Sequence, residues 1–375
     1  MTVSPSVLPQ FFLNFIYFFL LFSKKLCIIY MQRRVIQMAT LKDIAAATGI
    51  SVSTISRVLN QDESISVTSQ TQQKILEAAQ ALGYVPVRSR KSEGDRALKI
   101  GIAQMFESEQ VMQDPYYLYM KNALEQVCFS RGVETTPLFR DQQGNFAMQG
   151  EGGLDGIFAI GSFTWQEIRS FQKLSRHVVF VDSSPDDEQF FSAVPNFHLG
   201  VRQALNHLLD AGHVKIGFIG SHFTLQETHD LKLDARLYYF RNSLQDKGLY
   251  RPEWALDCEM TSPFAYQALS RAIKEWDQPP TALFISSDAM VQGVLRALDE
   301  AGWAIPEQIS LIAFNDTPLS QNATPPLSSV RVLQHELAVA AMTAMELSRS
   351  GAQYPFKTVV PCVFVDRRSV AKAKK

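Results

Sequence analysis

The stretch GISVSTISRVLN, residues Gly49 to Asn60, decides how the first part of this chain folds. Ile55, Val58 and Leu59 recur at helical spacing and form one apolar stripe, while small and hydroxyl side chains occupy the other faces. The glycine can adopt the left-handed conformation that closes a preceding helix, and Ser51 is a typical N-cap residue. The pattern therefore predicts a tight turn followed by a short amphipathic helix.

The segments on either side of this stretch complete a predicted three-helix unit over residues 38–85. Thr40 and Asp43 have the spacing of a capping box, and Thr68 supplies a hydroxyl at the start of the third helix. Two helices joined by a tight turn and supported by a third are the arrangement of a helix-turn-helix head. The residues expected to form its core are Leu41, Ile44, Ala45, Ile55, Val58, Leu59, Ile75, Leu76, Ala79 and Leu82.

The outward surface of the second helix is suited to DNA. Short side chains such as Val52 and Ser53 allow a helix to approach a groove closely, and Arg57 has the length to hold a guanine edge with two hydrogen bonds. A small helical domain with an ordinary polar face is the alternative. The hydroxyl groups that suit phosphate oxygens belong to Ser51, Thr54 and Ser56.

The segments ATLKDIAAATGISVSTISRVLN and VTSQTQQKILEAAQALGYVP resemble the head of the lac-repressor (LacI/GalR) family. The resemblance extends from about Met38 to the end of the chain and is strongest to repressors of galactose and β-galactosidase genes. It implies that Val52, Ser53 and Arg57 contact bases. Further candidate contacts to phosphates, or positions that pack the head, are Thr40, Ser51, Thr54, Ser56, Asn60 and Tyr84.

Residues 86–97 are expected to be a hinge. Members of the resembled family insert a leucine from this segment into the minor groove, but VRSRKSEGDRA (residues 87–97) contains none. Arg88, Arg90 and Lys91 could instead hold phosphates or enter a narrow minor groove, and a flexible charged linker is an equal alternative. The third helix begins TSQTQQK, with fewer basic residues than relatives carry, which predicts a weaker dependence of DNA binding on salt.

From Leu98 onward, strand-like segments such as LKIGIA and HVVFVD alternate with amphipathic helices. Such alternation predicts an α/β fold with parallel sheets covered by helices on both faces. The resemblance implies two periplasmic-binding-protein-like lobes over residues 98–375, which bind an effector and form a dimer. The expected limits are about 98–195 for the first lobe and 196–330 for the second, with crossovers returning at about 331–366.

Polar residues near the ends of the predicted strands are the candidate sugar contacts, because carboxylates and arginine can pair with neighbouring hydroxyls. The resemblance implies this role for Arg236. A helix cap is an equal interpretation of Asp288, and core packing is an alternative to ring stacking for Tyr116. Many relatives carry Asn in place of Ser287, which weakens any identification of the sugar. The full set is Tyr116, Asp182, Arg236, Ser287, Asp288, Asn315 and Asp316.

Composition and motifs exclude several classes of protein. The net charge is −1, so any DNA contact must come from a local basic surface. The four cysteines are scattered, as in a reducing, cytoplasmic protein. No metal-ligand spacing, nucleotide-binding loop or catalytic motif occurs, so we expect no enzyme activity, no cofactor and no metal.

The two ends of the chain raise separate questions. The apolar run FFLNFIYFFLLF (residues 11–22) is shorter than the roughly 20 residues that span a bilayer. We expect residues 1–37 to be a mis-annotated or disordered extension, with Met38 as the start and no membrane contact. An extracytoplasmic or membrane-tethered sugar-binding protein is the alternative. The last residues, AKAKK, show no leucine heptad, which favours a homodimer over a tetramer.

The sequence thus predicts a cytoplasmic, nucleoid-associated repressor of sugar-utilisation genes. Its partners would be a second copy of the chain, double-stranded operator DNA with two half-sites, and a small sugar, either a galactoside or another hexose. Sugar binding would release the operator, although a repressor whose DNA binding is tightened by its ligand has the same fold.

Overall fold

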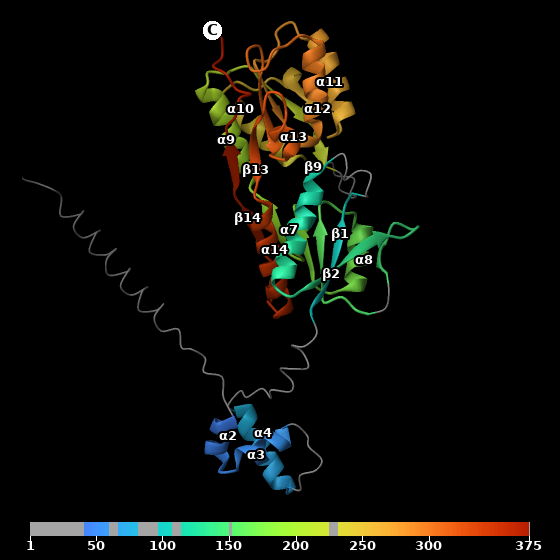
Figure 1. Ribbon diagram of the computed structural model, residues 1–375, viewed down its shortest axis with the longest axis vertical. Coiled ribbons are helices and arrows are strands. Elements are labelled where there is room, and N and C mark those ends of the chain that lie inside the picture. The colour runs from blue at the N-terminus through green and yellow to red at the C-terminus, as the bar shows by residue number, and fades with distance from the viewer. Residues whose placement is uncertain are drawn as a thin grey trace, which may run out of the picture. The chain divides into compact units, whose positions relative to one another are not determined.

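The computed structural model describes residues 41–59, 67–81, 97–106, 114–149, 152–224 and 232–374 (Figure 1). The chain divides into two compact units, Met1–Arg96 and Ala97–Lys375, and each is described by itself. The helices of the first unit are α2 (Leu41–Thr48), α3 (Val52–Leu59) and α4 (Ser69–Ala81).

A small apolar core joins these three helices. Ile44, Ile55 and Ile75, one from each helix, are fully buried. Gly49 has a φ of +71°, the left-handed conformation expected between α2 and α3. The predicted helix-turn-helix head is therefore confirmed. The expected core position of Leu76 is wrong: its side chain is 50% exposed, because its neighbour Ile75 takes the inward position on α4.

The second unit contains two lobes, and the first, called here the N-lobe, is built on a seven-stranded sheet. The strand order is β14-β6-β5-β4-β1-β2-β3, with β3 antiparallel to β2 and the other neighbouring pairs parallel. The strands are β1 (Lys99–Gln104), β2 (Glu134–Arg140), β3 (Phe146–Met148), β4 (Gly156–Ile160), β5 (Val178–Val181), β6 (Phe191–Pro195) and β14 (Lys357–Val360). The helices are α7 (Tyr116–Ser130), α8 (Trp165–Leu174) and α14 (Gln334–Arg349).

The second lobe, the C-lobe, is built on a six-stranded sheet in the order β10-β7-β11-β12-β13-β15, with only β15 antiparallel to its neighbour within the described residues. Its strands are β7 (Ile216–Gly220), β10 (Ala255–Asp257), β11 (Ala282–Ile285), β12 (Ser310–Asn315), β13 (Ser328–Val332) and β15 (Cys362–Val365). Its helices are α9 (Phe197–Asp210), α10 (Ala235–Gln245), α11 (Ser262–Glu275), α12 (Val291–Glu300) and α13 (Pro318–Gln321). Short elements η1 (Pro252–Trp254), η2 (Asp288–Met290), β8 (Phe223–Thr224) and β9 (Lys232–Leu233) complete it.

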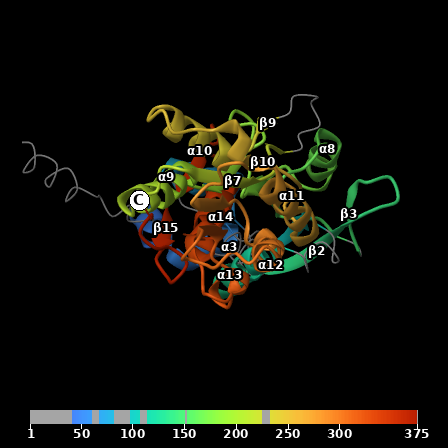
Figure 2. The same ribbon diagram turned by 90° about the horizontal axis from the view of Figure 1, so that it is seen from above.

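Both sheets are buried on both faces, as expected for parallel strands between helices. Figure 2 shows α9 and α11 on opposite sides of β7 in the C-lobe. Along β4, Ile157 and Ala159 join the core under α8, while Phe158 and Ile160 join the core under α7 and α14. In the C-lobe, α9 and α10 cover one face and α11 and α12 the other. The predicted α/β fold class is confirmed.

Three stretches of the described chain connect the lobes. β6 leads into α9, β13 leads back to α14, and β14 leads to β15. Consequently α14 and β14, which come late in the sequence, belong to the N-lobe, and β15 returns to the edge of the C-lobe.

Candidate DNA-binding surface and effector site

The exposed side of α3 is short-chained and polar. Ser51 caps the helix, because its Oγ accepts the backbone N–H of Thr54 at 3.2 Å, and it also lies 2.8 Å from the Thr54 hydroxyl oxygen. Val52, Ser53 and Arg57 are exposed, on the side opposite the buried stripe of α3. The helix therefore presents small side chains, a hydroxyl cluster and one guanidinium together, as a surface for phosphates and base edges requires.

The other predicted DNA contacts either are less exposed or lie outside the described residues. Ser56 is partly buried on α3. The candidates Thr40, Asn60, Tyr84 and Arg88, and the hinge up to Arg96, lie outside the described residues.

In the second unit, the carboxyl ends of the strands of both lobes bring a set of polar residues together. We call it the interlobe cluster. It consists of Asp114, Tyr116, Tyr117 and Asp182 from the N-lobe and Asp234, Arg236 and Ser287 from the C-lobe.

Asp182 is the centre of the N-lobe half. It follows β5 with a φ of +69°, and its two carboxylate oxygens accept the hydroxyls of Tyr116 at 2.8 Å and Tyr117 at 3.3 Å. Burial raises the pKa of Asp182 to about 6, although these hydrogen bonds and Arg236 oppose the rise. Tyr116 is 3% exposed and packs in the N-lobe core, so it positions Asp182 and is not open to stack on a ligand.

Arg236, at the start of α10, is the centre of the C-lobe half. Asp234 holds it with two side-chain hydrogen bonds, from Nε at 3.0 Å and from Nη2 at 2.7 Å. Nη1 donates to the backbone oxygen of Ser286 at 2.7 Å, and the guanidinium carbon lies 5.6 Å from the ring centre of Phe197 and 5.8 Å from that of Phe314. Arg236 is thus fixed in place beside the N-lobe acids.

Asp114 connects the two halves. It precedes α7 and accepts the backbone N–H of Tyr116 at 3.2 Å. Burial raises the pKa of Asp114 to about 6, although this hydrogen bond and two C-lobe side chains, Arg236 and Ser287, oppose the rise. The sequence pattern singled out the ring of Tyr116 and missed this acid, which lies two residues earlier. It also missed Asp234, whose signal was its place two residues before Arg236.

The other predicted effector residues form bonds inside the C-lobe. Asp288 is fully buried and accepts the backbone N–H of Thr317 and, at 2.9 Å, the hydroxyl of Ser320. Burial raises its pKa to about 7. Its interpretation as a helix cap is wrong, because Ser287 caps η2.

Asn315 and Asp316 follow β12, both with left-handed backbone, at φ +101° and +58°. The Asp316 carboxylate lies 2.7 Å from Arg331 and 2.7 Å from Arg367, two residues from later in the chain. These ion pairs engage Asp316. The Asn315 side chain, by contrast, forms no hydrogen bond or ion pair with the other described residues.

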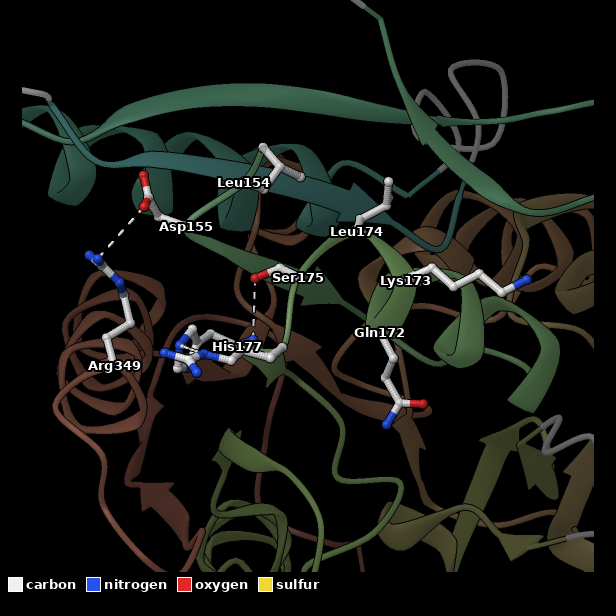
Figure 3. Close-up of a pocket in the computed structure, with 9 residues that line it drawn as sticks. Leu154, Asp155, Gln172, Lys173, Leu174, Ser175, His177 and Arg349 are labelled. Atoms are coloured by element: carbon white, nitrogen blue, oxygen red, sulfur yellow. Dashed lines mark hydrogen bonds and ion pairs between the residues drawn. The ribbon is translucent and has the colours of Figure 1, made fainter. Parts of the chain in front are cut away.

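A separate pocket of about 430 Å³ lies at the opposite, amino end of β4 and β5 (Figure 3). Arg349 lies 3.7 Å from Asp155, and the backbone N–H of His177 donates to the hydroxyl of Ser175 at 3.2 Å. Arg176 donates to the ring of the same histidine at 2.9 Å. The polar groups of this pocket largely satisfy one another, and none belongs to the interlobe cluster.

The described residues contain no group of three or more potential metal ligands. None of the helices in the described part of the chain has the length and apolarity needed to cross a membrane.

The head and the two-lobed unit together define a class of protein. Residues 40–87 match the family of bacterial regulatory proteins of the lacI type, and residues 205–370 match a periplasmic binding protein-like domain. The chain belongs to the lacI family of bacterial regulatory proteins.

Particular relatives agree with this assignment. The HTH-type transcriptional regulator GalR of Streptococcus thermophilus is 33% identical over 305 residues, which are 81% of this chain and 91% of the relative. Among solved structures, the transcriptional regulator CelR in complex with cellobiose superposes with a TM-score of 0.61 at 19% identity, over 88% of this chain and 99% of that one. The lac repressor dimer bound to operator and the anti-inducer ONPF gives 0.59 at 20% identity, over 89% and 100%. These two structures support the fold.

Proposed function

We propose that this chain is a sequence-specific DNA-binding repressor of sugar-utilisation genes that a small sugar, a galactoside or related hexose, releases from its operator. One observation carries the proposal. The same chain contains a helix, α3, with an exposed polar face, and a two-lobed unit in which carboxylates and Arg236 lie together in the interlobe cluster. Carboxylate and guanidinium groups pair with neighbouring hydroxyls in the way that sugar recognition needs.

The proposed contacts follow the geometry. Val52, Ser53 and Arg57 face the bases, and Ser51 and Thr54 the phosphates. On the effector side, Asp114, Asp182, Arg236 and Ser287 contact the sugar, and Asn315 completes the set. We leave Tyr116, Asp288 and Asp316 out of direct contact. The Tyr116 hydroxyl already donates to Asp182, and the side chains of Asp288 and Asp316 are fully buried inside the C-lobe.

The coupling uses the interlobe cluster. A ligand shifts an equilibrium only if it binds one state better than the other. A sugar that bridges Asp182 of the N-lobe and Arg236 of the C-lobe favours the arrangement in which the lobes are closed, and we propose that this arrangement separates the two heads from their half-sites. The role requires no catalysis, and it places the protein in the cytoplasm with the chromosome.

The test is a gel-shift titration with DNA from upstream of the gene and its neighbours, at one fixed salt concentration. The 375-residue chain and a chain that starts at Met38 are compared, with galactose, lactose and glucose added one at a time. A specific shift that one sugar releases supports the proposal. A sugar that tightens the shift would indicate a co-repressed regulator, and no shift under any condition would contradict DNA binding by this head.

A homodimer is part of the proposal, and an apolar face of the N-lobe supports it. α7 and α14 pack side by side, and on their outer surface Leu118, Tyr119, Phe129 and Leu347 are exposed, Phe129 to 86%. Several large exposed apolar side chains on two adjacent helices favour an interaction surface, and two heads are needed for two half-sites.

Substituting glutamate at Phe129 is therefore expected to raise the dimer dissociation constant by at least about tenfold, because a charge would be buried in the interface. Sedimentation velocity measures it. Tyr354→Glu, at another highly exposed aromatic, 73% exposed and just before β14, is the matched control. An unchanged dimer in the Phe129 variant would remove this face from the interface.

The sugar is expected to stabilise the two-lobed unit more at pH 7.5 than at pH 5. Asp114 and Asp182 have folded-state pKa values of about 6, above the 3.8 of a free side chain. Between pH 3.8 and about 6 the folded state binds more protons than the unfolded state, so the free energy of unfolding falls as the pH rises through this window. Above it the two carboxylates are ionised and accept sugar hydroxyls, so the sugar restores part of the lost stability. Melting temperatures with and without sugar at both pH values measure this. Equal sugar-induced shifts would contradict it.

A further inference from the structure

The charge balance of the interlobe cluster is unusual for a site that binds an anion. Among the side chains that the structure describes, Arg236 is the one cation that acts on all three carboxylates of the cluster, those of Asp114, Asp182 and Asp234.

The guanidinium itself is almost fully engaged. Of its five N–H groups, one on Nε and one on Nη2 donate to Asp234, one on Nη1 donates to the Ser286 backbone oxygen, and Nη2 lies 3.3 Å from the sulfur of Met260. A phosphate group prefers two parallel N–H groups of one arginine. Arg236 presents its Nε and Nη2 pair to Asp234, and the Nη1 and Nη2 end is already taken up by Ser286 and Met260, so neither parallel pair is fully free for a ligand.

The acids, by contrast, have acceptor capacity left. Each oxygen of Asp182 accepts one tyrosine hydroxyl, and Asp114 accepts the Tyr116 N–H. A carboxylate has about four acceptor sites, so both retain room for hydroxyl donors. A sugar hydroxyl can donate there. A phosphate ester carries about two negative charges at neutral pH and offers only acceptors.

We infer that the interlobe cluster selects an uncharged sugar that donates hydroxyl hydrogens to Asp114 and Asp182, and that it discriminates against phosphorylated forms of the same sugar. This inference rests on the proposed function and names the chemical class of its effector. Asp114 has the larger part in the discrimination, because it lies at the contact between the lobes and carries no ion pair of its own comparable to that of Asp234.

The experiment compares matched ligands by calorimetric titration of the full chain at pH 7.5. The free sugar is the one that releases the operator in the gel shift, and its 1-phosphate and 6-phosphate are the competitors. The free sugar is expected to bind at least about tenfold more tightly than either ester. Asp114→Asn is expected to narrow that ratio several-fold by removing one negative charge. Asp299→Asn, at an exposed acid on α12, should leave the ratio unchanged.

The possible outcomes distinguish failure of the discrimination against phosphate esters from failure of the proposed sugar-responsive function. An ester that binds as tightly as the free sugar, or more tightly, overturns the inference while the sugar-responsive regulator stands. Absence of binding by every free sugar and every ester overturns the sugar response and the inference with it. If Asp114→Asn does not fold, the ratio measured on the unaltered chain still decides.

Discussion

Arg236→Met is expected to abolish release of the operator by sugar and to lower the free energy of unfolding of the two-lobed unit by about 3–5 kcal/mol. The side chains of Arg236 and Asp234 are 12% and 4% exposed, so removal of the cation leaves a carboxylate buried without its partner. Arg236 holds the pKa of Asp234 below its ordinary value against the effect of burial, and that support is lost as well. Urea unfolding followed by tryptophan fluorescence measures the change.

Two further variants separate stability from function. Combining Asp234→Asn with Arg236→Met removes both charges, and we expect it to recover part of the stability without the sugar response. Arg271→Met, at an exposed arginine on α11, should change neither the free energy of unfolding nor the release of the operator by sugar. An Arg236→Met protein that is as stable as the parent and still leaves the operator on addition of sugar would remove this residue from the proposed site.

Arg57→Ala is expected to weaken operator binding by about 10- to 100-fold, equivalent to about 1–3 kcal/mol, with little effect on non-specific DNA. The side chain is exposed on α3, outside the core of Ile44, Ile55 and Ile75, so the head should melt as before. Fluorescence anisotropy with operator and scrambled duplexes measures both affinities.

A charge-conserving substitution tests the reason for this loss. Arg57→Lys keeps the cation but loses the two-pronged donor geometry, so it should bind operator almost as weakly as Arg57→Ala and leave non-specific binding unchanged. Equal losses on both duplexes for Arg57→Ala would show that Arg57 contacts phosphate and not a base.

The head could be predicted from sequence because its determinants are local. The caps at Ser51 and Thr68, the turn at Gly49 and the stripe through Ile55 and Val58 all lie within short segments. The error at Leu76 arose at the edge of such a stripe, where periodicity does not separate one helical position from the next.

The effector site could be predicted only in part, because its partners come from distant segments. Asp182 stood out by its place after a predicted strand, and Arg236 by the resemblance to the family. Nothing local to Asp316 indicated that Arg331 and Arg367, on later segments, would engage it. Asp114 was missed since its importance comes from Ser287, in the other lobe. Long-range pairing of charges depends on the packing of the whole unit, which sequence periodicity does not report.

The three connections between the lobes have a mechanical consequence. A single peptide link would let two bodies swivel in many directions, whereas three links side by side allow little more than bending about the line through them. One proteolytic cut at any crossing would leave the lobes attached by the other two. If a sugar binds Asp182 and Arg236 as proposed, it acts on two lobes that can move relative to each other in essentially one way, and a small displacement at the cluster is transmitted in a fixed direction.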